Sequence, residues 1–309
     1  MIAEVLLVLA GHESSLYPKD HHLHPAFAPL LHPGEQECLE ALGLIALRYR
    51  NIKSKSSQLS QSSSRYVCAL CATLTQILQD EYDTLVVRTE EKVLRRDASL
   101  VASGSFVPLS SIRATFADWD APLAALQDLM VELENKTEWL PGPLIDVLMS
   151  RSHTGTLTLI YYPYTDELTH SLGMNKIADV FSRLSCAVQR VWRTQLTALI
   201  VHGSINQSDP LVSEDYIPLE GSMPSCVSAQ TRDSILYIGR AIGTVKAEKW
   251  QAQLPRALAQ QHTEMIHNTL PEDTIAFDRV VSAIRTNVSE WLWLHVLTQA
   301  DVDDAAESL

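Results

Sequence analysis

The sequence predicts an all-α fold made of consecutive helical bundles, and three observations support this. Apolar residues recur at three- and four-residue intervals over nearly the whole chain, which is the period of an amphipathic helix. Only residues 156–162, Thr-Leu-Thr-Leu-Ile-Tyr-Tyr, have the composition typical of a strand. The segments between the periodic stretches are mostly short, as connections within stacked bundles are.

The longest periodic stretch covers residues 177–203 and predicts one long helix with a single buried stripe. Gly203 follows its last apolar positions, where a residue with positive φ is easiest to place. Trp192 lies on the stripe, so we expect its side chain to be buried. The apolar positions of this stripe are Ile177, Val180, Phe181, Leu184, Val188, Val191, Trp192, Leu196, Leu199 and Ile200.

The same period predicts the other helices. Pro122 is expected to open a helix, because proline is favoured in a first turn and the acids just before it suit the helix dipole. Residues 53–64 are rich in Ser, Lys and Gln, which predicts a flexible connector and a plausible phosphorylation target. The expected helices cover about residues 1–11, 35–51, 65–100, 112–116, 123–133, 143–151, 174–202, 232–245, 250–269 and 274–299.

Length and charge limit the class of protein. At about 150 residues per domain, 309 residues predict about two cores. We place a first bundle at about 1–140 and the following bundles at 141–309. The net charge of −13 argues against binding to nucleic acid or to anionic membranes, which require basic patches. The sequence has no uninterrupted apolar run of the roughly 18 residues that a membrane span needs.

The cysteines and histidines predict no metal or cofactor site. Five scattered cysteines are typical of reduced thiols in the cytosol or nucleus. Cys68 and Cys71 form a C-x-x-C pattern, but no second pair accompanies them, so we interpret them as two small residues on one helix face. His21, His22 and His24 cluster in a loop without Cys or carboxylates at ligand spacing, which indicates a solvated loop.

The chain offers no motif for catalysis. Phosphate-binding loops, nucleophile elbows and the H-E-x-x-H zinc pattern are all missing from the sequence, so we do not expect an enzyme. Carboxylates alternate with Lys and Arg in the manner of solvated helix faces.

Two tryptophans near the C-terminal end are expected to differ in how deeply they are buried. Trp291 follows Ile284 and Val288 at helical spacing and is assigned to the core. Trp293 points about 160° away from Trp291 on a helix, so we expect it to be exposed, or to be an interface or interdomain contact. It is the one candidate site residue in the chain, because aromatic side chains often anchor protein interfaces.

Several short segments, spread in order over residues 1–300, match sequence motifs of one known protein family. They are Glu4-Val-Leu-Leu-Val-Leu-Ala-Gly11, Leu31-His-Pro-Gly-Glu35, residues 142–155, Trp192-Arg-Thr-Gln-Leu-Thr-Ala-Leu-Ile-Val-His-Gly203 with Asp209 and Leu211 after it, Ile235-Leu-Tyr-Ile-Gly-Arg240, and residues 277–285 before a Trp-rich helix. Together they resemble the motifs of the gamma-tubulin complex component family, the spoke proteins of the microtubule-nucleating ring. Arg240 replaces the family's Lys, and residues 156–172 suggest an insertion or an altered loop.

This resemblance implies a structural role without a cofactor. It implies the elongated N-terminal half of a component, which would contact other components side by side through their N-terminal halves. Gamma-tubulin would bind the C-terminal half, which we expect to lie outside this sequence. The resemblance also implies a place in the cytoplasm, at microtubule-organising centres or spindle pole bodies.

Two further expectations concern identity. The motifs begin at Met1 without a leading extension, which favours the component 4 branch of the family. The alternative is a helical adaptor or scaffold unrelated to gamma-tubulin. A helical-repeat adaptor would show a fixed internal period of 30–50 residues, and we find none in the sequence.

Overall fold

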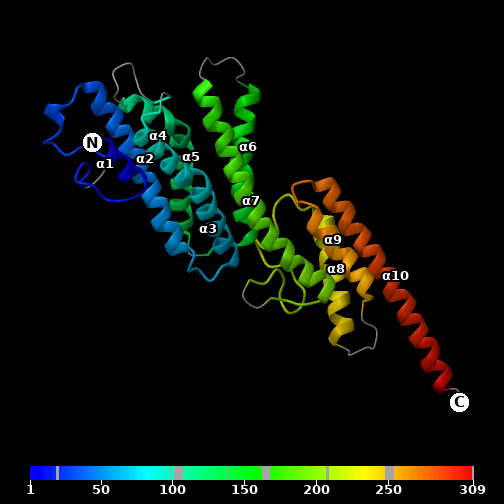
Figure 1. The fold of residues 1–309 in the computed structure, drawn as a ribbon. Helices are drawn as coiled ribbons and strands as arrows, with labels where there is room; N and C mark the ends of the chain where they lie inside the picture. Colours follow the sequence, from blue (N-terminus) through cyan, green and yellow to red (C-terminus); the bar gives the residue numbers. More distant parts are fainter. Residues whose placement is uncertain are drawn as a thin grey trace. The chain divides into compact units, whose positions relative to one another are not determined.

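A computed structural model describes residues 1–18, 21–97, 99–100, 107–136, 138–161, 168–206, 209–247 and 254–307. Within these ranges the chain is almost entirely helical, and the only extended pairing is an isolated bridge between Val212 and Pro218. The all-α prediction is therefore confirmed (Figure 1). The elements are α1 (Ile2–Leu9), η1 (Ala28–Leu30), α2 (Pro33–Leu59), α3 (Arg65–Ile77), the π-helix η2 (Leu78–Asp83), α4 (Thr84–Arg95), α5 (Leu109–Asn135), α6 (Pro141–Tyr161), α7 (Leu168–His202), α8 (Ala229–Ala247), α9 (Arg256–Asn268) and α10 (Thr274–Glu307).

The chain divides into two compact units. The first comprises Met1–Ser62, Val67–Glu138 and Leu148–Ser185, and the second comprises Ser63–Tyr66, Trp139–Val147 and Cys186–Leu309. The helices α3, α6 and α7 each contribute residues to both units. The predicted domain limits at about 140 stay a prediction.

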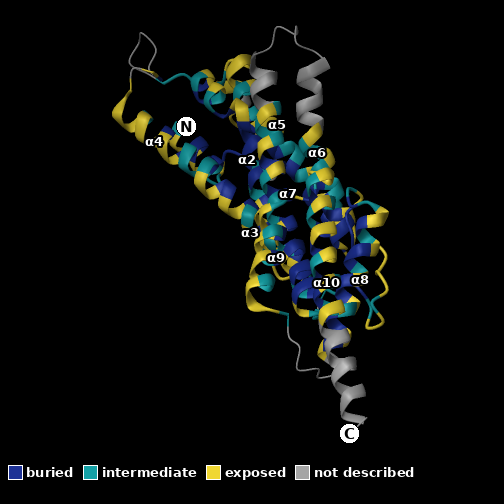
Figure 2. Cartoon of the chain, turned by 90° about the vertical axis from the view of Figure 1, so that its right-hand side faces the viewer, coloured by how far each residue is buried: buried dark blue, intermediate teal, exposed yellow. Residues whose placement is uncertain are grey.

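In the first unit, α2 packs along α5, and α1 packs against α2 and α4. The core of this unit is aromatic around Tyr82, whose ring stacks on Tyr49 at 4.4 Å and meets Trp119 edge-on at 5.4 Å between ring centres. Ion pairs close the exposed edge between α2 and α5, where Lys55 Nζ lies 2.6 Å from a carboxylate oxygen of Glu134. Buried residues follow the inner faces of these helices in Figure 2.

Three local predictions are wrong, and each has a physical reason. Pro122 does not open a helix but lies inside α5. The fully buried Phe116, Trp119 and Leu123 lie on both sides of it, and their burial outweighs the lost backbone hydrogen bond. Residues 156–161 are the end of α6 rather than a strand, since strand propensity is a weak preference that the surrounding structure overrides.

The third concerns the expected connector at residues 53–64, of which residues 53–59 continue α2. Ile52 and Ser56 are both buried on the face that α2 turns inward. The Ser56 hydroxyl donates to the Cys71 carbonyl oxygen at 3.4 Å, so its polarity is satisfied within the core. A Ser-rich composition therefore did not prevent a helix with one buried side.

In the second unit, α8 and α9 both pack against α10, beside the C-terminal part of α7. Trp192 is fully buried, as the stripe predicted. Trp291 is also buried, with 7% of its surface exposed, whereas Trp293 is 67% exposed. The helical period thus separated these two tryptophans correctly.

Candidate functional site

Trp192, a motif residue of α7, connects two other segments of the second unit to that helix. The indole Nε1 of Trp192 donates to the carbonyl oxygen of Ser222 at 3.1 Å, in the loop before α8. Its ring lies 5.9 Å from that of Phe277 on α10. A buried indole usually needs such an acceptor. Trp192 therefore holds the loop and α10 against α7.

Arg193, the next motif residue, caps the end of α9. It is buried, and its Nη1 donates to the carbonyl oxygens of His267 and Thr269, the latter at 3.4 Å. These carbonyls lie at the negative end of the α9 dipole, where a cation is favourable. Burial lowers the pKa of the guanidinium from its usual value. The buried positive charge of Arg193 is therefore explained by its contacts with the carbonyl end of α9.

Two more motif residues hold the start of α3. The Tyr66 hydroxyl donates to Oε1 of Gln195, and burial raises the Tyr66 pKa well above its usual range. Oδ2 of Asp209 accepts a hydrogen bond from the backbone N–H of Arg65, the first residue of α3, at 3.2 Å. A carboxylate at this position satisfies a free amide and suits the positive end of the helix. Asp209 thus acts as a cap from a distant part of the sequence.

Gly203 ends α7 where the chain crosses α8. Its φ is +56°, as expected for the predicted helix end. A Cβ on Gly203 would lie 2.7 Å from the backbone nitrogen of Gly243. The Tyr216 ring covers Gly243, and its hydroxyl lies 3.4 Å from the Gly203 carbonyl oxygen. Both glycines are therefore required by close packing.

The motif Leu31-His-Pro-Gly-Glu35 is a helix start in the first unit. His32 Nδ1 accepts from the Gly34 backbone N–H at 3.3 Å, and Glu35 Oε2 accepts from the His32 backbone N–H at 3.2 Å. Pro33 occupies the first helical position, where its missing N–H costs nothing. The motif residues on α2 and α7 therefore begin and end helices and hold neighbouring segments in place.

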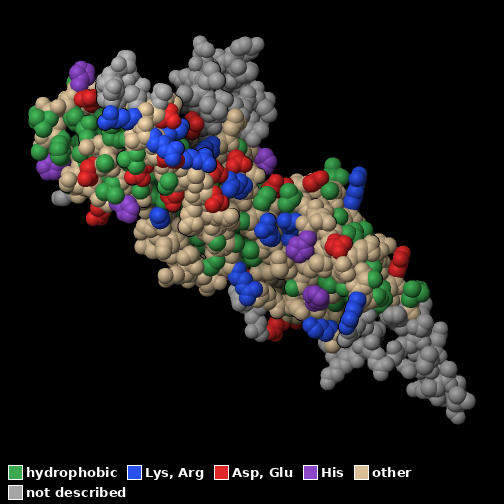
Figure 3. All heavy atoms as spheres, viewed as in Figure 1, with side chains coloured by type: hydrophobic (Ala, Val, Ile, Leu, Met, Phe, Trp, Pro, Cys, Tyr) green, Lys and Arg blue, Asp and Glu red, His purple; other side chains and the backbone are tan. Residues whose placement is uncertain are grey.

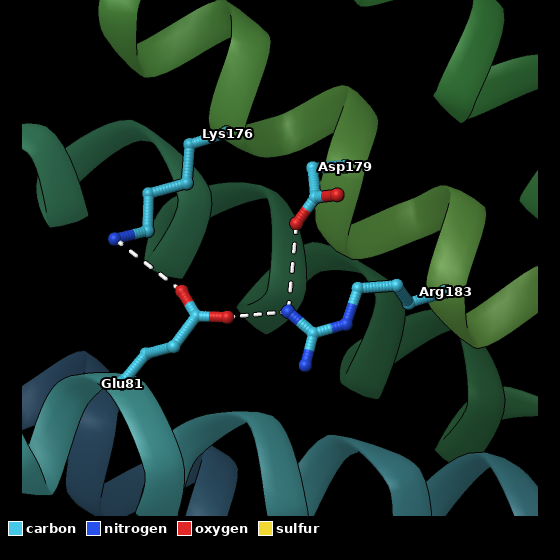
Figure 4. A network of polar contacts seen from close by, with 4 residues as sticks. All are labelled: Glu81, Lys176, Asp179 and Arg183. Carbon is cyan, nitrogen blue, oxygen red and sulfur yellow. Dashed lines mark hydrogen bonds and ion pairs between the residues drawn. The ribbon is translucent and has the colours of Figure 1, made fainter.

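A polar network in the first unit joins η2 to α7 (Figure 4). The carboxylate of Glu81 pairs with Arg183 and lies 3.7 Å from Lys176 Nζ, while Arg183 also lies 3.5 Å from Asp179. Lys176 Nζ is 3.7 Å from the centre of the Trp119 ring, a cation–π contact. Burial is the main cause that lowers the Lys176 pKa, and Glu81 opposes it.

This network could not be predicted from the sequence, because η2 has no compositional signature. A π-helix adds one residue to a turn and rotates all later side chains relative to a regular helix. Here η2 contains both Tyr82, whose ring lies in the aromatic core, and Glu81, whose carboxylate faces α7. The alternation of carboxylates with Lys and Arg predicted solvated helix faces, but Glu81 of η2 pairs with Lys176 and Arg183 within the first unit.

The structure does not test the role of Trp293, which stays a prediction. Its exposure leaves the side chain available for contact with another segment. Among the described residues, no cluster of His, Cys, Asp or Glu could hold a metal ion. No helix within the described ranges combines the length and the apolar character that crossing a membrane requires. The described cysteines form no disulfide bond.

A comparison with known protein families shows to which family the chain belongs. A family model described as "Gamma tubulin complex component N-terminal" matches residues 2–299. The chain belongs to this family. It is also 26% identical over 218 residues to the gamma-tubulin complex component gfh1 of Schizosaccharomyces pombe, an alignment that covers 67% of this chain and 34% of that protein. The chain thus spans about a third of the length of this relative.

Proposed function

We propose that this chain is a structural part of a gamma-tubulin complex, and that it assembles side by side with the equivalent part of neighbouring components. The observation that carries the proposal is the family match, which extends over nearly the whole chain from residue 2 to residue 299. The name of the S. pombe relative points to the same complex. The role is that of a scaffold that helps template microtubule nucleation, with no cofactor and no catalysis.

The internal use of the motif residues supports a scaffold role. Trp192, Arg193 and Asp209 contact other parts of their own unit, which makes the helices rigid relative to one another there. Rigid elements position an interface more precisely than loops do. Contacts with neighbours would then use exposed helix faces, and Trp293 is one candidate for such a contact or for a contact with a further domain.

Symmetry constrains the form of the assembly. Homologous subunits in a ring or spiral meet through a heterologous contact, in which one flank faces the opposite flank of the next subunit. Two copies of a chain with a net charge of −13 repel at long range, so self-association should be weak at low salt. A less acidic homologue is a better neighbour. We assign gamma-tubulin to a C-terminal half of the full protein, and the complex to microtubule-organising centres of the cytoplasm.

Co-purification tests this function directly. The 309-residue chain is expressed with the N-terminal half of each other component, and separately with gamma-tubulin. We expect it to retain at least one component and not gamma-tubulin. Tight binding to gamma-tubulin with no component retained would overturn the proposal. Retention of neither would favour the alternative, a helical adaptor unrelated to gamma-tubulin.

A further inference from the structure

The helices α3 and α4 run into each other through η2 without a break, but the two halves are held very differently. Of the twelve residues of α4 only Val86 and Thr89 are buried, and none after Thr89 is. Figure 2 shows exposed and intermediate residues along most of α4. The half before η2 is anchored in the core of the first unit. Its buried side chains there are Val67, Leu70, Cys71, Leu74 and Ile77.

Three successive residues of η2 fix the junction between the two halves. The Glu81 carboxylate pairs with Arg183 on α7. The ring of Tyr82 is part of the aromatic core, and Oδ1 of Asp83 accepts a hydrogen bond from the Tyr49 hydroxyl on α2 at 2.6 Å. The junction is therefore held from several sides at once.

Beyond the junction these contacts stop. Thr89 Oγ1 donates to the Leu85 carbonyl oxygen at 2.7 Å, and Arg95 pairs with Glu91 at 2.7 Å, both within α4. Among the described residues, no side chain of α4 forms a hydrogen bond or an ion pair with any helix other than α4 itself and η2. Across space α4 packs mainly against α1. A segment with so few buried and polar contacts is one that opens locally at low cost.

The π-helix η2 is also the place where this long helix can bend. The buried residues Leu78, Tyr82 and Val86 are spaced by four, and on a regular helix each such step turns the buried side by about 40°. The additional residue of the π-turn offsets this rotation, so that both halves can face the core. A π-turn is one of the few established causes of a helix kink, because the regular ladder of backbone hydrogen bonds is interrupted there.

The outer face of α4 is hydrated whether or not the helix moves. Figure 3 shows Lys and Arg side chains gathered over α4. Movement of α4 would therefore bring only its small inner side into water, which keeps the loss of buried apolar area low. The charged residues of α4 are Arg88, Glu90, Glu91, Lys92 and Arg95.

The helix that α4 covers is apolar. Glu4 is the only polar side chain among the eight residues of α1, and Val5, Leu6 and Leu9 are buried. Since α1 packs against both α2 and α4, it would remain on α2 if α4 moved away. The side of α1 that faces α4 would then be uncovered.

We propose that α4 is a hinged flap, which turns about η2 and uncovers α1 while the rest of the first unit stays folded. During this motion η2 keeps its contacts with α2 and α7. The first unit thereby has a second, open form in which apolar side chains of α1 reach the solvent. This inference goes beyond the proposed function, because it assigns a conformational change that needs no partner.

Thiol labelling of the full chain tests the flap. Val86→Cys places a thiol on the buried side of α4, and the native Cys71 on α3 reports on opening of the core. Iodoacetamide alkylates each thiol only while it is exposed, and mass spectrometry of the digested protein measures the rate at each position. We expect position 86 to react at least about 100-fold faster than Cys71. Low urea should accelerate the reaction of Cys71 far more than that at position 86, because a local opening exposes little surface.

Further variants locate the hinge. Leu78→Cys places a thiol on the buried side of η2, and this position should react as slowly as Cys71. Deletion of Gln79, an exposed residue of η2, converts the π-turn into a regular turn and should slow the reaction at position 86 at least about tenfold. Deletion of Glu90, an exposed residue of α4, is the matched control and should not slow it. Circular dichroism confirms that each variant folds.

Three results would overturn the proposal. They are a reaction at position 86 as slow as that of Cys71, a reaction at position 78 as fast as that at 86, and an unchanged rate at 86 after deletion of Gln79. If that deletion prevents folding, the rates at positions 71, 78 and 86 decide alone. No other component takes part, so a failure here can be told apart from a failure of the proposed function.

Discussion

The backbone of Gly203 lies against that of Gly243, so close that a Cβ on the first would be 2.7 Å from the amide nitrogen of the second. This crossing of α7 and α8 leaves no room for side chains, and Tyr216 closes it from outside with its ring over Gly243. The first prediction follows from this geometry.

Gly243→Ala should destabilise the protein by about 1–3 kcal/mol, the usual cost of overpacking a tight site. Helix propensity alone would favour Ala over Gly by up to about 1 kcal/mol, so the sign of the effect is informative. The added Cβ would lie 1.7 Å from the Tyr216 hydroxyl oxygen, which forces the ring to move. The measurement is urea unfolding followed by circular dichroism.

The control for this substitution is Gly34→Ala near the start of α2, where a Cβ would meet nothing closer than His32 Nδ1 at 3.6 Å. We expect that change to stay within about 0.5 kcal/mol. Tyr216→Ala should make Gly243→Ala less costly, because the two residues are in contact. Equal costs of Gly243→Ala with and without the Tyr216 ring would show that the clash is not its cause.

The sequence predicted the helices well where one face is continuously apolar. The stripe of α7 placed Trp192 inside, and the period of α10 separated Trp291 from Trp293. Such predictions need only local spacing, because burial of one side determines which residues face inward. Strand propensity at residues 156–161 and proline at 122 were weaker local preferences, and both were overridden.

The hydrogen bonds between distant segments could not be predicted from helical periodicity. The bond from Arg193 to His267 joins residues 74 positions apart, and that from Arg65 to Asp209 spans 144. Each depends on how helices pack, which one sequence does not determine. The π-helix η2, which contains Tyr82 of the aromatic core, likewise has no compositional signature from which it could have been predicted.

Trp192→Ala should cost about 3–5 kcal/mol of unfolding free energy, the range for a large aromatic side chain deleted from a core. The substitution leaves a cavity beside Phe277 and removes the donor to the Ser222 carbonyl oxygen. Chemical denaturation measures the loss. Trp293→Ala removes the same atoms from an exposed position and should change stability by less than about 0.5 kcal/mol. Similar costs at the two positions would contradict the assignment of the buried stripe.

Acidification should destabilise the second unit through His262. Its side chain is fully buried, Nε2 lies 3.3 Å from Asn287 Nδ2, and Nδ1 has no hydrogen-bond partner among the described residues. Burial lowers the His262 pKa below its model-peptide value of 6.5. As the pH falls below 6.5, the unfolded chain binds a proton that the folded chain excludes, so stability is lost in that direction.

The slope due to one such group is at most about 1.4 kcal/mol per pH unit. Urea unfolding at pH 7.5, 6.5 and 5.5 measures it. His262→Gln should flatten the dependence below pH 6.5, although it also lowers stability at every pH. His267→Gln, on the exposed side of the same helix α9, is the matched control and should leave the slope as it is. A slope that is identical in the wild type and in His262→Gln would exclude His262 as the source.

The last prediction concerns Glu81, which meets both Lys176 and Arg183. Glu81→Gln keeps the shape of the side chain but removes the charge that both cations share. We expect a loss of about 1 kcal/mol, because the three side chains are only partly exposed and form a network rather than an isolated pair. Asp179→Asn is the control, since Asp179 is 61% exposed and lies 3.5 Å from Arg183 at the edge of the network. It should cost less than about 0.5 kcal/mol.

Raising the salt concentration should shrink the difference in stability between the two variants by screening. A Glu81→Gln variant as stable as Asp179→Asn at low salt would mean that helix packing alone holds η2 against α7.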